Sequence, residues 1–125
     1  MLNEILLYTG SVVIILWGAA HIVVTKSVVS GFGEISADNR RIITMEWLDE
    51  GLTLCFIGLL VLFTALWGGG PSPVSCIVYT MSAAMLLVLA GVSLFTGART
   101  SIIPIKICPI VKTAVALLFV LGSML

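Results

Sequence analysis

The sequence predicts an all-α integral membrane protein, an antiparallel bundle of four transmembrane helices that forms a single membrane domain over residues 1–125. Composition is the first observation behind this prediction. Of the 125 residues, 60% are hydrophobic and 10% are charged, whereas soluble domains are roughly 45–50% apolar and 25% charged. The second observation is that four apolar segments each reach the length of about 20 residues that a helix needs to cross a hydrocarbon core.

The four segments follow one another along the chain, with helices expected at about residues 5–24, 38–67, 74–96 and 105–125. None shows the alternation of apolar and polar residues that marks a strand of a membrane barrel. The second helix should project beyond the bilayer, because N-capping side chains occur well before its apolar part. The glycine- and proline-rich link after it predicts a tight antiparallel hairpin of the second and third helices.

Apart from Lys112 within the fourth predicted helix, basic side chains are confined to the first and third connections and the residues beside them. They are Lys26, Arg40, Arg41, Arg99 and Lys106. The N-terminal segment, the second connection and the C-terminal end contain none. Since cytoplasmic loops carry the excess of Lys and Arg, both termini are predicted outside, in a multi-pass protein of the cell membrane.

Ionisable side chains within a spanning helix are costly and tend to face partners or water inside the bundle. Glu50 and Lys112 lie at similar predicted depth, so we expect an ion pair between the second and fourth helices. Trp17 and His21 are four residues apart and share one helix face, as do Glu46 and Glu50. These five residues are the candidate ligand-binding groups of a polar pocket that opens to the cytoplasm, and no catalytic residue is assigned.

Three of the five candidates also have a purely structural interpretation. Glu46 fits an interfacial carboxylate beside Arg40 and Arg41. His21 fits a core imidazole that is bonded to a backbone carbonyl. Lys112 fits a side chain that extends its amine toward the headgroups without a partner.

The three cysteines, Cys55, Cys76 and Cys108, are widely spaced, with neither a C-x-x-C motif nor a Cys/His cluster in the sequence. This spacing supports neither a disulfide framework nor a zinc site. We therefore expect three buried apolar thiols, no metal site and no cofactor. Cys108-Pro109 has only a superficial similarity to metal-transport motifs.

Three short motifs in the first half of the chain resemble small four-helix membrane proteins of the DoxX-like group. The motifs are Trp17-Gly18-Ala19-Ala20-His21, Asp38-Asn39-Arg40-Arg41 and Glu46-Trp47-x-x-Glu50-Gly51. The resemblance implies the four-helix fold. It implies no particular activity and assigns no catalytic residue.

The sequence favours a small membrane protein whose pocket binds or transports a small or amphipathic ligand, with proton coupling as an option. One alternative is a membrane enzyme for a lipid-like substrate, with Glu50 or His21 as the acid–base group. Another is a non-catalytic subunit of a membrane complex. The expected partners are the lipid bilayer, a small-molecule or lipid ligand and a second copy in a homodimer, and no nucleic acid is expected.

Overall fold

The computed structural model describes residues 1–68 and 70–125. In this part of the chain it contains four α-helices and one short 3-10 turn. They are α1 (Leu2–Ser30), α2 (Ala37–Trp67), α3 (Pro73–Phe95), η1 (Gly97–Arg99) and α4 (Ile103–Met124). The predicted all-α, four-helix architecture is confirmed, and all four helices are long and apolar enough to cross a membrane. Gly69, in the predicted second turn, lies outside the described residues.

Local sequence explains where the helices begin and end. α1 continues to Ser30, past the predicted end at residue 24, because residues 25–30 contain neither glycine nor proline. α2 begins at Ala37, where the side chain of Ser36 accepts a hydrogen bond of 3.1 Å from the backbone N–H of Asn39. α3 likewise has a serine N-cap and a proline in its first turn.

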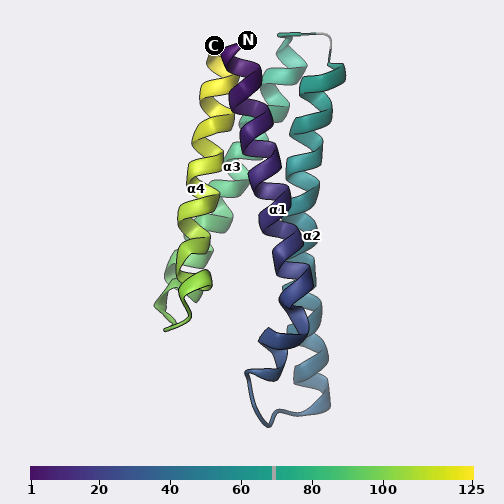
Figure 1. The fold of residues 1–125 in the computed structure, drawn as a ribbon, viewed down its shortest axis with the longest axis vertical. Helices are drawn as coiled ribbons and strands as arrows, with labels where there is room; N and C mark the ends of the chain where they lie inside the picture. Colours follow the sequence, from purple (N-terminus) through teal and green to yellow (C-terminus); the bar gives the residue numbers. More distant parts are fainter. Residues whose placement is uncertain (69) are drawn as a thin grey trace.

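The four helices run alternately up and down, so the two termini lie at the same end of the bundle (Figure 1). α1 packs mainly against α2, α3 mainly against α4, and contacts between α1 and α4 join the two pairs. α2 and α3 are consecutive and antiparallel but touch little, so the predicted hairpin is not a tightly packed unit. The pairs separate away from the termini, at the end that holds residues 31–36 and 96–102, called the open end below (Figure 1).

Glycines allow α1 and α2 to approach closely. A Cβ placed on Gly18 would lie 2.6 Å from the backbone oxygen of Gly51, and one on Gly58 would lie 2.5 Å from a side-chain carbon of Ile15. Neither position leaves room for a methyl group. Small residues at such contacts let helix backbones meet, and here they fix the first helix pair.

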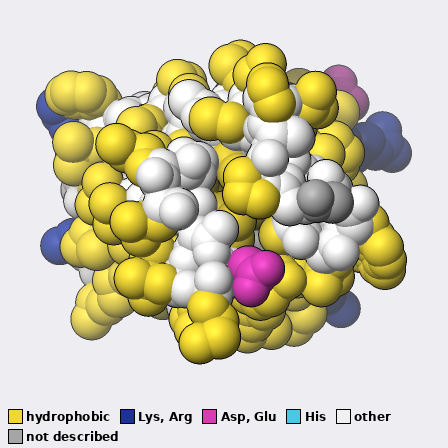
Figure 2. Space-filling view, turned by 90° about the horizontal axis from the view of Figure 1, so that it is seen from above, with side chains coloured by type: hydrophobic (Ala, Val, Ile, Leu, Met, Phe, Trp, Pro, Cys, Tyr) yellow, Lys and Arg dark blue, Asp and Glu magenta, His cyan; other side chains and the backbone are white. Residues whose placement is uncertain are grey.

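The buried core consists of large apolar side chains between the helices, including Ile14, Leu54, Leu86 and Phe119. Large apolar side chains also cover the outside of the bundle along all four helices. At the end that carries the termini, Figure 2 shows mainly apolar and uncharged groups, with Lys and Arg side chains only at the margin of the view. An apolar exterior of this extent exceeds what a soluble monomer normally exposes.

Candidate functional site

A buried ion pair links three helices. The ammonium group of Lys112, on α4, donates hydrogen bonds to Oε1 of Glu50 on α2 and, at 2.7 Å, to Oγ of Ser93 on α3. The Lys112 side chain is 0% exposed and that of Glu50 is 31% exposed. The predicted pair is thereby confirmed, and the alternative of an unpaired lysine that reaches outward is wrong.

The imidazole of His21 lies on α1, close to this pair, and is 8% exposed. Its Nδ1 is 2.9 Å from the backbone oxygen of Trp17. Because a carbonyl oxygen only accepts hydrogen bonds, Nδ1 carries the proton, and Nε2 keeps its lone pair in the neutral ring. The interpretation of His21 as an imidazole bonded to a backbone carbonyl is confirmed, and its second nitrogen faces the thiol of Cys108.

Two indoles enclose the His21 ring. Trp47 stacks on it at 5.0 Å between ring centroids, and Trp17 meets it edge-on at 6.0 Å. Trp47 also donates a hydrogen bond of 2.7 Å from Nε1 to the backbone oxygen of His21. The hydroxyl of Thr25 donates a second hydrogen bond to the same oxygen. These contacts tie the open-end part of α2 to α1 and hold the imidazole in one orientation.

Cys108, at the start of α4, completes the polar cluster. Its thiol is 5% exposed, with Sγ 4.0 Å from Nε2 of His21, and it accepts a hydrogen bond of 3.4 Å from the indole N–H of Trp17. One potential ligand atom from each of His21, Glu50 and Cys108 lies within 4.8 Å of the others. We define His21, Glu50, Cys108 and Lys112 as the buried cluster.

The other two thiols differ from Cys108. Cys76 is exposed, and Cys55 is half-buried with Sγ 3.5 Å from the backbone oxygen of Ile15. The prediction of three buried thiols is therefore met only by Cys108, because Cys55 is half-buried and Cys76 lies on the outer side of α3.

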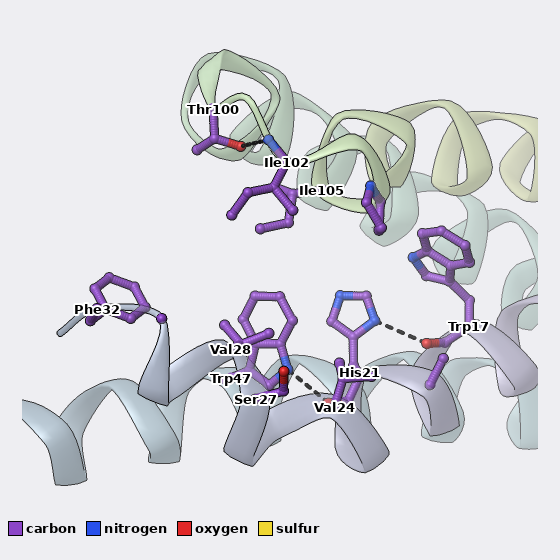
Figure 3. Close-up of a pocket in the computed structure, with 13 residues that line it drawn as sticks. Trp17, His21, Val24, Ser27, Val28, Phe32, Trp47, Thr100, Ile102 and Ile105 are labelled. Atoms are coloured by element: carbon purple, nitrogen blue, oxygen red, sulfur yellow. Dashed lines mark hydrogen bonds between the residues drawn. The ribbon is translucent and has the colours of Figure 1, made fainter.

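A crevice of about 590 Å³ leads from the open end to His21, between the α1–α2 pair and the start of α4. Its lining residues are Trp17, Ala20, His21, Val24, Ser27, Val28, Gly31, Phe32, Trp47, Thr100, Ile102, Pro104 and Ile105. Figure 3 shows the rings of His21 and Trp17 at one end of the gap, with Phe32 at the other and Ile102 and Ile105 across it. The walls are mainly apolar, whereas the sequence analysis expected a polar pocket.

Four of the five predicted site residues come together, in two layers. Trp17 and His21 line the crevice, and Glu50 and Lys112 lie in the cluster behind them. Glu46 lies exposed on α2 and belongs to neither group. Sequence reasoning missed the contributions of Trp47, Ser93 and Cys108, which come from three different helices.

Comparison of the chain with protein-family models, with curated proteins and with solved structures finds no match. The resemblance to the DoxX-like group therefore stays a prediction.

Proposed function

We propose that this chain is a multi-pass protein of the cell membrane that binds a single-chain anionic amphiphile in the crevice, from the cytoplasmic side. The observation that carries the proposal is a mainly apolar crevice that runs from the open end to a ring-enclosed imidazole, in a bundle whose exterior is also apolar. The apolar body of the ligand lies along the crevice walls, and its head group lies at the open end.

The distribution of charge supports an inward-facing open end. Lys26, Arg40, Arg41, Arg99 and Lys106 all lie in or next to the connections at that end. Because positively charged connections stay in the cytoplasm, both termini are outside in this proposal.

Reporter fusions test that orientation. Alkaline phosphatase fused after Leu125 is expected to be active in a bacterial host, because the enzyme folds only outside the cytoplasm, and green fluorescent protein at the same position is expected to be dark. Fusions of both reporters within residues 31–36 are expected to give the opposite pattern. Bright green fluorescence at the C-terminus would contradict the proposed topology.

The size and chemistry of the crevice support an amphiphile. Its volume of about 590 Å³ lies within the range of about 300–1,000 Å³ for small-molecule sites. A ligand that arrives from lipid gains nothing from apolar contact alone, since lipid is equally apolar. Selectivity must come from the aromatic walls and the rim, where residues 26–41 and 99–106 carry five basic and two acidic side chains. This rim favours a negatively charged head group.

Fluorescence quenching tests the proposal directly. In a Trp67→Phe background, the remaining tryptophans are Trp17 and Trp47, which both line the crevice. Dibrominated stearate should quench them saturably in detergent, and unbrominated stearate should reverse the effect. Ala20→Phe, which fills the crevice, is expected to weaken the competitor's apparent affinity at least about tenfold, or about 1.4 kcal/mol.

Ala84→Phe is the matched control, because Ala84 is an exposed alanine on α3 that does not line the crevice. It should bind stearate like the parent. Quenching that rises without saturation and is equal in both alanine variants would show simple partition into the detergent, and the proposal would fail.

A further inference from the structure

We propose that His21 and Cys108 bind a Cu(I) ion within the bundle, with Glu50 and Lys112 as the charge pair beside it. Such a site needs no bound amphiphile, since only His21 of its residues belongs to the crevice lining, and Cys108 and Lys112 lie outside it. It departs from the expectation of no metal site, which rested on sequence spacing alone. The residues come from three helices, so no local sequence motif could predict the site.

The positions of the two donor atoms suit an ion held between them. Nε2 of His21 and Sγ of Cys108 are 4.0 Å apart. Metal–sulfur and metal–nitrogen bonds of about 2.3 and 2.0 Å place opposed ligands about 4.3 Å apart. An ion therefore fits between the two atoms in a nearly linear arrangement after a shift of a few tenths of an ångström.

The hydrogen bonds around His21 and Cys108 favour metal binding by both side chains. The backbone oxygen of Trp17 holds the proton of His21 on Nδ1 and leaves the lone pair of Nε2 directed toward the sulfur. Histidine ligands of metals typically have this kind of second partner. The indole N–H of Trp17 points at Sγ of Cys108 and stabilises negative charge there.

Charge favours a monovalent ion over a divalent one. Lys112 and Glu50 already balance each other in the cluster. When Cu(I) replaces the thiol proton of Cys108, one positive charge leaves and one enters, so the net charge of the site does not change. A divalent ion would add an uncompensated charge next to the fully buried ammonium of Lys112, which is costly in a dry interior.

The number and softness of the donors favour copper as well. Thiolate and imidazole are ligands that Cu(I) accepts, and Cu(I) is stable with two or three ligands. Among the residues that the structure describes, the site offers two donor side chains, those of His21 and Cys108, while the third potential donor, Glu50, is paired with Lys112. Structural zinc sites are almost always four-coordinate, so this donor set is too small for one.

An entry path is present, because the crevice ends on His21. An ion that enters at the open end meets the imidazole first and the thiol behind it. The site is thus accessible from the side that is cytoplasmic in the proposed orientation, where thiols are kept reduced.

Anaerobic titration with Cu(I), in competition with a colorimetric Cu(I) chelator, tests the inference on the detergent-purified full chain. A Cys55→Ser/Cys76→Ser background leaves Cys108 as the single thiol. We expect one copper per chain, with one sulfur and at least one nitrogen neighbour in the X-ray absorption spectrum. Cys108→Ser or His21→Gln in this background should weaken binding at least about tenfold, as loss of a ligand costs no less than loss of a second partner.

Circular dichroism and thermal unfolding of each variant establish that the helices are intact. The X-ray absorption spectrum is measured on the Cys55→Ser/Cys76→Ser protein, which retains both proposed ligands, so this result does not depend on the folding of the ligand variants. Cu(I) bound equally well by Cys108→Ser, a spectrum without sulfur, or tighter binding of Zn(II) than of Cu(I) would each overturn the assignment.

Discussion

Glu50→Gln is expected to destabilise the folded protein by about 3–5 kcal/mol, the range for removal of one partner from a buried pair. Lys112 is fully buried, and its two hydrogen-bond acceptors are Glu50 and Ser93. The glutamine side chain keeps the size of Glu50 and removes its charge. The variant therefore leaves a buried ammonium with only a neutral hydroxyl and an amide as partners. This unpaired charge lowers the stability of the folded state.

Thermal unfolding of the purified protein in detergent, followed by circular dichroism at 222 nm as is usual for helices, measures this effect. Glu46→Gln is the matched control, since Glu46 lies one turn earlier on the same helix and is exposed. Its effect should stay within about 0.5 kcal/mol, as for most surface substitutions. Equal midpoints for the two variants would show that the buried pair contributes nothing to the fold.

A double variant separates the charge from the packing. Glu50→Leu with Lys112→Met removes both charges and retains similar side-chain volume, and such replacements are often neutral or stabilising. We expect it to recover most of the stability that Glu50→Gln loses. Recovery would show that the charged pair is not required for stability, because an apolar pair holds the helices equally well.

The features that could be predicted from the sequence are those that depend on length, depth and spacing within one helix. The four helices follow from long apolar segments. The contact between Trp17 and His21 follows from their spacing of four residues. The pair of Glu50 and Lys112 follows from equal depth and opposite charge, since a buried amine needs a nearby acid.

The features that could not be predicted depend on how the helices are rotated and splayed against one another. Each of the four helices contains a long, mainly apolar stretch, so hydrophobic periodicity does not mark the faces that meet. The approach of Cys108 to His21, and of Ser93 to Lys112, depends on how the helices are rotated about their axes, which the sequence pattern does not indicate. Glu46 shares a helix face with Glu50, yet it lies exposed toward the open end, where the helix pairs separate.

The apolar lining of the crevice has the same origin. The sequence predicted that all five candidate residues line one polar pocket that opens to the cytoplasm. In the structure the pairs separate, and Glu50 and Lys112 meet behind His21 rather than in the crevice wall. The separation therefore decides which side chains a ligand meets.

Gly18→Ala is expected to destabilise the protein by about 1–3 kcal/mol, the usual cost of overpacking a close contact. The added methyl carbon would lie 2.6 Å from the backbone oxygen of Gly51 and 2.9 Å from the backbone nitrogen of Cys55. Backbone atoms cannot rotate away as a flexible side chain does. α1 and α2 would have to move apart at the point where they are closest.

Gly91→Ala is the control for this experiment, because a Cβ on Gly91 meets nothing within 4 Å among the described residues. Alanine is favoured over glycine inside a helix by about 0.5–1 kcal/mol, so this variant should unfold at the same or a higher temperature than the parent. The two alanine variants should therefore shift the unfolding midpoint in opposite directions. A Gly18→Ala protein at least as stable as the Gly91→Ala protein would contradict the close contact of α1 and α2.

Gly18→Ala should also disturb the site, since Gly18 lies between Trp17 and His21 on α1. Separation of α1 from α2 lengthens the hydrogen bond from Trp47 to the backbone oxygen of His21 and loosens the stacked rings. In the Trp67→Phe background, the tryptophan emission of Gly18→Ala should shift to longer wavelength, as Trp47 becomes more exposed. An unchanged emission spectrum together with a lower unfolding midpoint would show that Gly18 contributes to stability but does not position His21.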